Sequence, residues 1–540
     1  MRLKLSVLFL PVLLVLVLFG CSKKSTEPED GAGSGAKWTV IGYMDGNNNL
    51  DISLNNTSYV IADVQEMEAV GSSDDVNMVV CVGSIKTGGI VKDYYVEHHT
   101  DELPDHISSP MLRNEGTRDM SDPQTLIDFL DYVKENYPAE HYLLIIDDHG
   151  GGWRGACSDD QNGSGNLMSM RQIKSAIEDF GGVDILIFHA CLMGQLEVVY
   201  ELKDVADYIL GSEFTLPMES ILGSQEWLDT LVSHSSITPE ALSGVVVDAV
   251  YNAAVRKGKY THFSSIDASQ VQSLAVKVGN LGNHLVTESG SYWNEVTEAW
   301  GHTHYSDYDD PAFVDIREFI NNLRNEPHLG VNPIIRADAD SVIAAINRAV
   351  VRTVTNVPAM TRGGLTIHFP SAHEDFDSTN YVQLAFRSTN WFAFLSQFIA
   401  NAGTPPVDEV DISGTVSWPG HGLSSNVVAF LDTSHSEYIV GILPSDVTPA
   451  TGAYEISFTL TGSLEAFVEA WDDVNGNEDM DVGDGIGWYD QNRDGEWNDM
   501  LTFVGGTTIA NADIELFEIT PGKSYLFHKK LHEWMLIGQM

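Results

Sequence analysis

Basic residues and cysteines are both scarce in this chain of 540 residues, and each shortage argues against a class of protein. Only 29 lysines and arginines stand against 77 aspartates and glutamates, which gives a formal net charge of −48. Because binding to a phosphate backbone needs clustered Lys and Arg, this balance argues against nucleic acid as a partner. With four cysteines in the chain, disulfides are not what holds the protein together. No G-x-S-x-G motif supports a serine hydrolase.

The first 21 residues have the pattern of an export signal. A basic "MRLK" precedes the apolar stretch "LSVLFLPVLLVLVLF", which is too short and wrongly flanked for an ordinary membrane span. The stretch ends in "LFGC", which resembles a bacterial lipobox, so we expect lipid on Cys21; a spanning anchor is the alternative. Residues 22–36 are typical of a flexible tether. We therefore expect a protein anchored by lipid alone to a bacterial envelope membrane, favouring the outer membrane, and facing outside the cytoplasm.

Short apolar runs alternate with helical patterns between residues 37 and about 400. Runs that are apolar on both faces are typical of parallel strands covered by helices. Helices are expected at 122–137, with Asp122 as the cap, and at 238–258, with Thr238 before a proline. This alternation predicts a doubly wound α/β sandwich with a mostly parallel sheet. The expected buried strands are 38–45, 76–83, 141–148, 183–190 and 363–369.

The helical pattern stops near residue 402, and short strands follow. Residues 403–411 have the composition of a linker, and residues 412–540 are expected to form a smaller all-β sandwich. Its β pattern resembles the transthyretin-like or carboxypeptidase-regulatory-like sandwiches appended to bacterial surface enzymes. The main α/β domain is expected to span residues 37–402.

Two strands of the expected sheet end in chemically active residues. "LLIIDDHGGGWRG" places His149 and three glycines after one strand, and "ILIFHACLMG" places Cys191 after another. Because ligands bind at the carboxyl ends of such strands, an imidazole and a thiol would face one another if the strands are neighbours. Cys81, within a core strand, and Cys157, which has no matching base, are expected to be ordinary core thiols.

A thiol beside an imidazole suggests nucleophilic chemistry. A free thiol titrates near pH 8.5, so a neighbouring imidazolium or a helix N-terminus is needed to stabilise the thiolate. Leu192, Leu196 and Val199 recur at helical spacing, which predicts a helix starting at or just after Cys191. The backbone N–H groups of Gly150 and Cys191 are the expected oxyanion donors.

These motifs resemble the clostripain family of cysteine peptidases, which belongs to the caspase-like clan. "DHGGGW" and "ACLMG" carry the resemblance, and "GYMDGNNNLD", "FVDIREF", "GGLTIHFP" and "YVQLAFRSTNWFAFL" extend it over residues 37 to 400. It implies a caspase-like α/β/α fold, with the catalytic histidine at His149 and the nucleophile at Cys191, and no cofactor for catalysis.

The chain departs from this family at one position. The family usually has an aspartate two residues before the nucleophile, which lines the pocket for the basic residue preceding the cut. Here that position holds His189, which offers no fixed negative charge, so a preference for arginine does not carry over. Glu213 and Glu219 are candidates for a replacement acid in the substrate pocket, and ordinary loop carboxylates are the alternative.

The densest acidic cluster lies in the second domain, at residues 472–500. Oxygen ligands at every second residue, with glycine where a loop turns, are the pattern that calcium requires. A merely solvated loop is the alternative, since the position where an EF-hand has its closing glutamate is Leu501. We expect structural Ca²⁺ at two ladders of side chains: Asp473, Asn475, Asn477, Asp479 and Asp481, and Asp490, Asn492 and Asp494.

Taken together, the sequence predicts a lipid-anchored cysteine endopeptidase that uses His149 and Cys191 on protein or peptide substrates. The alternative is a surface binding protein on a caspase-like fold that has lost activity, which the change at His189 would fit.

Overall fold

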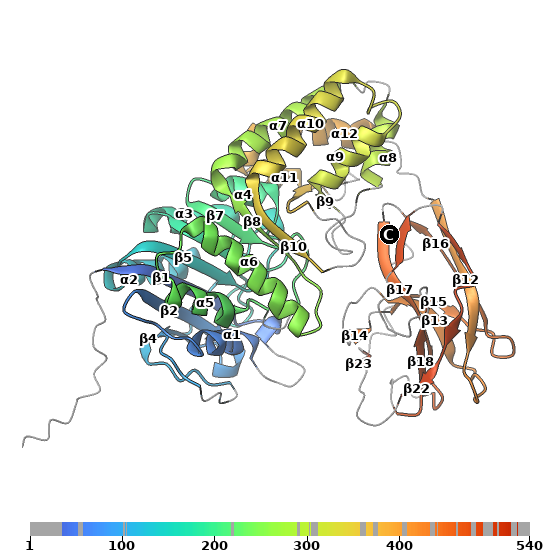
Figure 1. Ribbon diagram of the computed structural model, residues 1–540, viewed down its shortest axis with the longest axis horizontal. Helices are drawn as coiled ribbons and strands as arrows, with labels where there is room; N and C mark the ends of the chain where they lie inside the picture. Colours follow the sequence, from blue (N-terminus) through green and yellow to red (C-terminus); the bar gives the residue numbers. More distant parts are fainter. Residues whose placement is uncertain are drawn as a thin grey trace, which may run out of the picture.

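Two parts make up the fold of this chain in the computed structural model (Figure 1). The first is an α/β region built on one large sheet, and the second consists of strands from residue 408 onwards. The structure describes residues 35–51, 58–100, 103, 105–217, 221–288, 292–301, 303, 312–356, 363–370, 376–401, 408–432, 438–439, 441–460, 463–476, 482–489, 501–504, 507–519 and 526–527.

A nine-stranded sheet forms the centre of the first part. Its strands follow the order β10-β8-β7-β6-β5-β1-β2-β3-β4. The five neighbouring strands from β7 to β2 are parallel, and the pairings outside them are antiparallel. The bounds are β1 Ala36–Gly46, β2 Val76–Ser84, β3 Val91–Tyr95, β4 Met111–Gly116, β5 Ala139–Asp147, β6 Val183–His189, β7 Ala206–Gly211, β8 His262–Asp267 and β10 Val350–Thr355.

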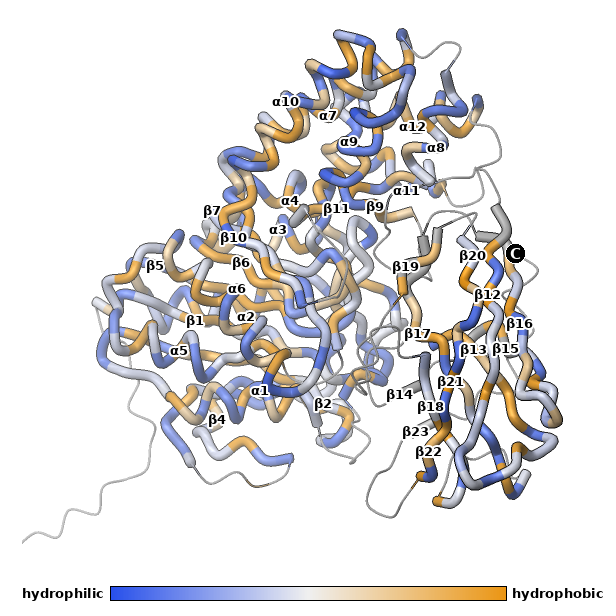
Figure 2. The backbone as a smooth tube through the Cα atoms, turned by 45° about the vertical axis from the view of Figure 1, so that its right-hand side comes forward, coloured by the Kyte–Doolittle hydropathy of each residue, from blue (hydrophilic) through white to orange (hydrophobic). Residues whose placement is uncertain are grey.

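Helices cover both faces of this sheet. Along β5, Leu143 and Ile145 belong to one hydrophobic cluster while Leu144 and Ile146 belong to the other, because successive side chains of a strand point to opposite faces. Figure 2 shows the hydrophobic residues concentrated in these central strands. The first cluster includes α1 Tyr59–Glu68, α5 Ser224–Ser233 and α6 Pro239–Arg256; the second includes α2 Pro123–Asn136, α3 Met170–Phe180, α4 Leu196–Leu202 and α7 Ala268–Glu288.

The predicted three-layer α/β sandwich is therefore confirmed. Strands β1, β2, β5, β6 and β11 lie where the apolar runs predict them, with β11 shorter than expected. Both predicted helix caps are also present. The Asp122 side chain accepts a hydrogen bond from the Gln124 N–H, and the Thr238 side chain accepts one from the Ala241 N–H.

The rest of the first part adds helices to the face that carries α7. Strand β9 pairs antiparallel with β11, and their side chains join the same hydrophobic cluster. Among the described residues, no helix is long and apolar enough to span a bilayer. The bounds are α8 Trp293–Gly301, β9 Phe313–Asp315, α9 Ile316–Asn325, α10 Pro333–Ala349, β11 Thr366–His368, α11 Ser378–Tyr381 and α12 Trp391–Asn401, with 3₁₀ helices η1 Asn49–Asp51, η2 Ile85–Thr87, η3 Gly152–Arg154 and η4 Ala385–Ser388.

Described residues beyond 408 form strands and connecting turns without helices. One sheet has the order β16-β12-β20 and another the order β15-β13-β17-β18-β22, and both contribute to one separate hydrophobic cluster. The resemblance to transthyretin-like sandwiches and the domain limits stay predictions. The bounds are β12 Asp408–Ser417, β13 Val427–Asp432, β14 Tyr438–Ile439, β15 Gly441–Asp446, β16 Ala453–Leu460, β17 Ser463–Asp472, β18 Gly485–Trp488, β19 Leu501–Val504, β20 Thr508–Ala510, β21 Ile514–Glu515, β22 Phe517–Glu518 and β23 Leu526–Phe527.

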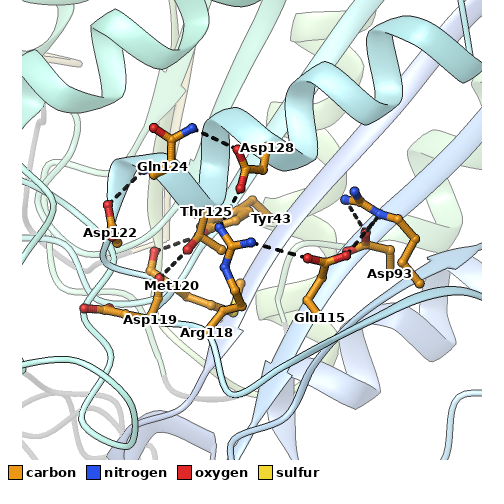
Figure 3. Close-up of polar contacts among 11 residues, drawn as sticks. Tyr43, Asp93, Glu115, Arg118, Asp119, Met120, Asp122, Gln124, Thr125 and Asp128 are labelled. Carbon is orange, nitrogen blue, oxygen red and sulfur yellow. Dashed lines mark hydrogen bonds and ion pairs between the residues drawn. The ribbon is translucent and has the colours of Figure 1, made fainter.

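A polar network fastens the segment between β4 and α2 to the central sheet (Figure 3). Arg118 forms ion pairs with Asp128 of α2 and with Glu115 of β4. The buried Tyr43 hydroxyl of β1 donates a hydrogen bond of 2.7 Å to the Met120 carbonyl. The start of α2 is thus held on the same strand that supplies the loop before η1.

Helix α4 is tied to β11 through one buried carboxylate. Glu197 Oε1 accepts hydrogen bonds from the Tyr381 hydroxyl at 2.7 Å and from the His368 N–H at 3.1 Å. Burial raises the pKa of Glu197 to about 7, although these two hydrogen bonds oppose the rise. The carboxylate therefore joins segments that lie more than 170 residues apart in the chain.

This raised pKa predicts a loss of stability with rising pH. The unfolded chain releases the Glu197 proton near the ordinary value of 4.5, whereas the folded chain keeps it until about pH 7. Stability therefore falls across this interval, because the unfolded state binds fewer protons there. We predict that Glu197→Gln removes this loss. Between pH 4.5 and about pH 7 its free energy of unfolding should rise by about 3 kcal/mol relative to that of the wild type.

Urea unfolding midpoints at about pH 4.5 and pH 8 check this prediction. Glu178→Gln, on an exposed position of α3, is the matched control and should follow the wild type at both values. Parallel losses of stability in the wild type and in Glu197→Gln would contradict the prediction.

Candidate active site

Strands β5 and β6 bring His149 and Cys191 to one edge of the sheet. The two strands are parallel neighbours, and Asp147 lies opposite His189 in their register. His149 and Cys191 each follow two residues later, so the two segments leave the sheet at the same level. At Gly150 the two segments touch, because a Cβ atom there would collide with the backbone N and O atoms of Cys191. The expectation that these strands are neighbours is confirmed.

The His149 ring is held from a third segment. Its Nε2 atom lies 2.8 Å from Asn49 Oδ1, in the 3₁₀ helix η1 that follows β1. Burial lowers the pKa of His149, and the charge of Asp160 opposes this only in part. A lowered pKa leaves the ring neutral at neutral pH, so it can accept a proton from a thiol.

Asn49 is a site residue that the sequence reasoning missed. It lies in "GYMDGNNNLD", which was used only as evidence of family resemblance. The available signal was the polar run directly after a buried strand, at the carboxyl end where the other site residues fall.

The expected helix start at Cys191 is wrong. Helix α4 begins only at Leu196, and Leu192 has a φ of 67°, which is outside the helical region. The turn instead packs beside the segment that leaves β7. The Leu192 N–H donates to the Phe214 carbonyl, and the Gly194 N–H donates to the Ser212 carbonyl. A helix N-terminus therefore does not stabilise a Cys191 thiolate. The Leu216 N–H does face the sulfur, at 3.3 Å from Sγ.

The glycine turn after His149 is a compact backbone loop. The Cys157 N–H donates to the His149 carbonyl, and the Gly151 N–H donates to the Gly155 carbonyl. Gly152 has a φ of 59°, a conformation that favours glycine. The Trp153 N–H then bonds to Gln195 Oε1 at 2.7 Å, which ties this loop to the turn after Cys191. Gly150 lies directly against the Cys191 backbone, and the role of their two N–H groups as oxyanion donors stays a prediction.

Beside the Cys191 thiol lies a small pocket, here called the acidic pocket, in which the sequence-predicted His189 is found. His189 Nδ1 lies 2.8 Å from Asp147 Oδ1 and 3.9 Å from Asp63 Oδ2. Burial alone would lower the pKa of His189, but the carboxylates of Asp147, Asp63 and Glu66 raise it to about 9. The lining residues are Asp45, Leu50, Tyr59, Val60, Asp63, Asp147, Asp148, His189, Ala190, Cys191, Leu216 and Pro217.

Of the two other candidates for the substrate pocket, Glu213 does not line this space. Glu213 is fully buried, with Oε1 at 3.5 Å from His262 Nε2 of β8. Glu219 lies outside the described residues. The acids that accompany His189 are instead Asp63 and Asp147, from α1 and β5. Asp63 was missed because nothing in the sequence brings α1 next to β6.

The remaining described cysteines are core residues, as expected. Cys81 and Cys157 are buried, and no disulfide joins them or Cys191. Burial raises the pKa of both thiols, and the nearby carboxylates Asp93 and Asp45 raise it further. Neither sulfur is accessible to a peptide.

Few of the expected calcium ligands can be placed. Asp473 is buried and accepts a hydrogen bond of 2.7 Å from the Gly476 N–H, and Asn475 follows it in the same turn. The residues Asn477, Asp479, Asp481, Asp490, Asn492 and Asp494 lie outside the described part of the chain. The calcium sites therefore stay predictions.

Comparison with known proteins gives the same assignment as the site geometry. The model of the clostripain family matches residues 42–394. Clostripain from Hathewaya histolytica is 27% identical over 306 residues, which are 47% of this chain and 57% of clostripain. The matched part thus spans little more than half of that relative.

Solved structures share the fold. A secreted C11 cysteine protease from Bacteroides thetaiotaomicron, solved with an irreversible peptide inhibitor, aligns with a TM-score of 0.52 at 18% identity and covers 67% of this chain and 99% of its own. An inactive zymogen C11 protease from Parabacteroides distasonis aligns with a TM-score of 0.51 at 19% identity, covering 65% and 97%. The matched residues 42–394 are more than half of the chain and contain β5, β6, His149 and Cys191, so this chain belongs to the clostripain family.

Proposed function

We propose that this chain is a cysteine endopeptidase in which Cys191 is the nucleophile and His149 carries the proton. The observation that supports this most directly is the position of the two residues, each two places beyond the paired Asp147 and His189 at the end of neighbouring strands. The Leu216 N–H at the sulfur favours formation of a thiolate, and the neutral His149 ring is free to accept the thiol proton.

The reaction follows from this arrangement. His149 accepts the thiol proton, and the Cys191 thiolate attacks the carbonyl carbon of the peptide bond. The backbone N–H groups of Gly150 and Cys191 stabilise the oxyanion that forms. The C–N bond then breaks as the protonated His149 gives its proton to the leaving amine. Water hydrolyses the acyl-enzyme and restores the thiol.

Removal of the sulfur should abolish peptide hydrolysis. We predict that Cys191→Ala and His149→Ala each lower kcat/KM on a mixed peptide library by about a thousandfold or more, because the nucleophile and its base act as a unit. The rate of product formation by the detergent-solubilised full chain is the measurement. Equal cleavage by the wild type and by Cys191→Ala would remove Cys191 from the mechanism.

Two controls separate catalysis from folding. Gly150→Ala should lower kcat roughly a hundredfold, since its methyl group displaces the Cys191 backbone, whereas Gly244→Ala has open space in α6 and should cleave normally. A small alkylating agent at neutral pH should modify Cys191 much faster than the buried Cys81 and Cys157. Equally slow labelling of all three would favour the alternative of an inactive surface binding protein.

Lipid anchoring is the second part of the proposal. It rests on the basic start, the short apolar stretch and the lipobox-like "LFGC" that ends in Cys21. We predict that the wild-type chain partitions into the detergent phase and the envelope membrane fraction, favouring the outer membrane, while Cys21→Ala does not. Equal membrane recovery of the two chains would favour the spanning anchor instead.

Structural calcium is the third part, and it rests on the spacing of oxygen ligands between residues 473 and 494. We predict that a calcium chelator lowers the unfolding temperature of the full chain and that added Ca²⁺, but not K⁺, restores it. An unfolding temperature that does not respond to either addition would favour a solvated loop.

A further inference from the structure

The acidic pocket has a composition that calls for a cation. Four aspartates and one histidine line it, and no lysine or arginine does among the residues that the structure describes. Water-molecule centres can reach a space of about 50 Å³ inside it. That space is enough for an ion with a small number of water molecules.

Three of these side chains converge from separate elements. Asp63 lies on α1, Asp147 ends β5 and His189 ends β6. Each offers a ligand atom, and these three atoms lie within 4.8 Å of one another. Small side-chain rotations would close this spacing to metal–ligand bonds of about 2 Å around one ion.

Two polar atoms of this group lack a hydrogen-bond partner. Asp147 and His189 are only 6% and 9% exposed. Within the described part of the chain, Asp147 Oδ2 and His189 Nε2 are buried and make no hydrogen bond. A buried polar atom without a partner is costly, because it has given up its hydrogen bonds to water and gained none in exchange. A cation held between Asp63 and Asp147 would give Asp147 Oδ2 a partner.

We propose that Asp63, Asp147 and His189 form a binding site for a divalent transition-metal ion of the Zn²⁺ class. Cys191 and Leu216 line the same pocket, so the ion would occupy the space beside the nucleophile and exclude the adjoining part of a substrate. Zinc is thus a reversible inhibitor of the peptidase. The inhibitory role, though not the binding site, rests on the proposed function.

The donor set favours zinc over the other cations that an acidic pocket attracts. Calcium takes oxygen ligands alone, whereas an imidazole nitrogen beside two carboxylates suits Zn²⁺. His189 Nδ1 faces both carboxylates, at 2.8 Å from Asp147 Oδ1 and 3.9 Å from Asp63 Oδ2, so this nitrogen completes the donor set. A histidine at this position thus converts an all-oxygen pocket into a mixed nitrogen and oxygen site.

Zinc binding can be measured without catalysis. The full chain carrying Cys191→Ala is titrated with Zn²⁺ against a chromophoric chelator, in millimolar Ca²⁺ to saturate other acidic sites. We predict one tight site in this protein. We also predict that adding His189→Ala or Asp63→Asn weakens it at least tenfold, since each removes one ligand.

His141→Ala is the matched control for these variants. His141 Nδ1 lies 2.7 Å from Asp184 Oδ1, so the same two strands carry a second histidine–aspartate pair at their other end. That pair belongs to no cluster of three ligands among the residues that the structure describes. Zinc affinity should therefore be unchanged in His141→Ala, and unfolding temperatures confirm that all variants fold.

Each outcome of the titration either supports the proposed zinc site or overturns it. Loss of affinity in both His189→Ala and Asp63→Asn supports the site. Unchanged affinity in both overturns it, and so does tight binding that requires the Cys191 sulfur, because the ion would then sit on the thiol and His149. Displacement of zinc by Ca²⁺ at equal concentration also overturns it.

Inhibition is tested separately on the wild type. Zn²⁺ should lower the rate of peptide hydrolysis, a chelator should restore it, and Asp63→Asn should need at least tenfold more zinc for the same effect. Zinc that binds the site without affecting hydrolysis overturns the inhibitory role. If neither the wild type nor Asp63→Asn cleaves peptides, the proposed function fails, while the zinc-binding result still stands.

Discussion

The parallel pairing of β5 with β6 is the constraint on which the site depends. A slip of one residue would move every side chain of one strand to the other face, which would separate His149 from Cys191 and pack the leucines and isoleucines of that strand against the opposite layer of helices. Polar pairs secure the register at both ends of the two strands. His141 bonds to Asp184 where they begin, and Asp147 bonds to His189 where they end. The reactive residues therefore inherit their positions from a fixed pair of strands rather than from the loops that carry them.

Buried carboxylates are the second feature of this edge of the sheet. Burial raises the pKa of both Asp45 and Asp148; the charge of Asp148 raises the pKa of Asp45 further, and the charge of Asp147 raises that of Asp148. Hydrogen bonds offset part of this cost, since Asp148 accepts from the Asn48 side chain and from the Ser158 N–H. These contacts hold the loops after β1 and β5 together. They are strong because they are buried, where the local dielectric constant is low.

Sequence patterns were enough for the sheet and for the pair His149 and Cys191, because continuous apolar runs and the edge rule for parallel strands are local signals. They failed for the helix after Cys191, where three leucine and valine positions fit a helical period although the first of them is packed in a left-handed turn. They also missed Asn49 and Asp63. Both reach the site from elements about one hundred residues or more distant in the chain, and only tertiary packing defines that proximity.

The contact between the Leu216 amide and the Cys191 sulfur links chemistry to backbone shape. If the Cys191 thiolate is acylated, the sulfur loses its negative charge and most of its strength as a hydrogen-bond acceptor. The Leu216 amide would then lose this acceptor, while the bonds from Leu192 and Gly194 to the Phe214 and Ser212 carbonyls would still hold the segment after β7. Acylation of Cys191 would therefore weaken the contact that joins the sulfur to Leu216 in the wall of the acidic pocket.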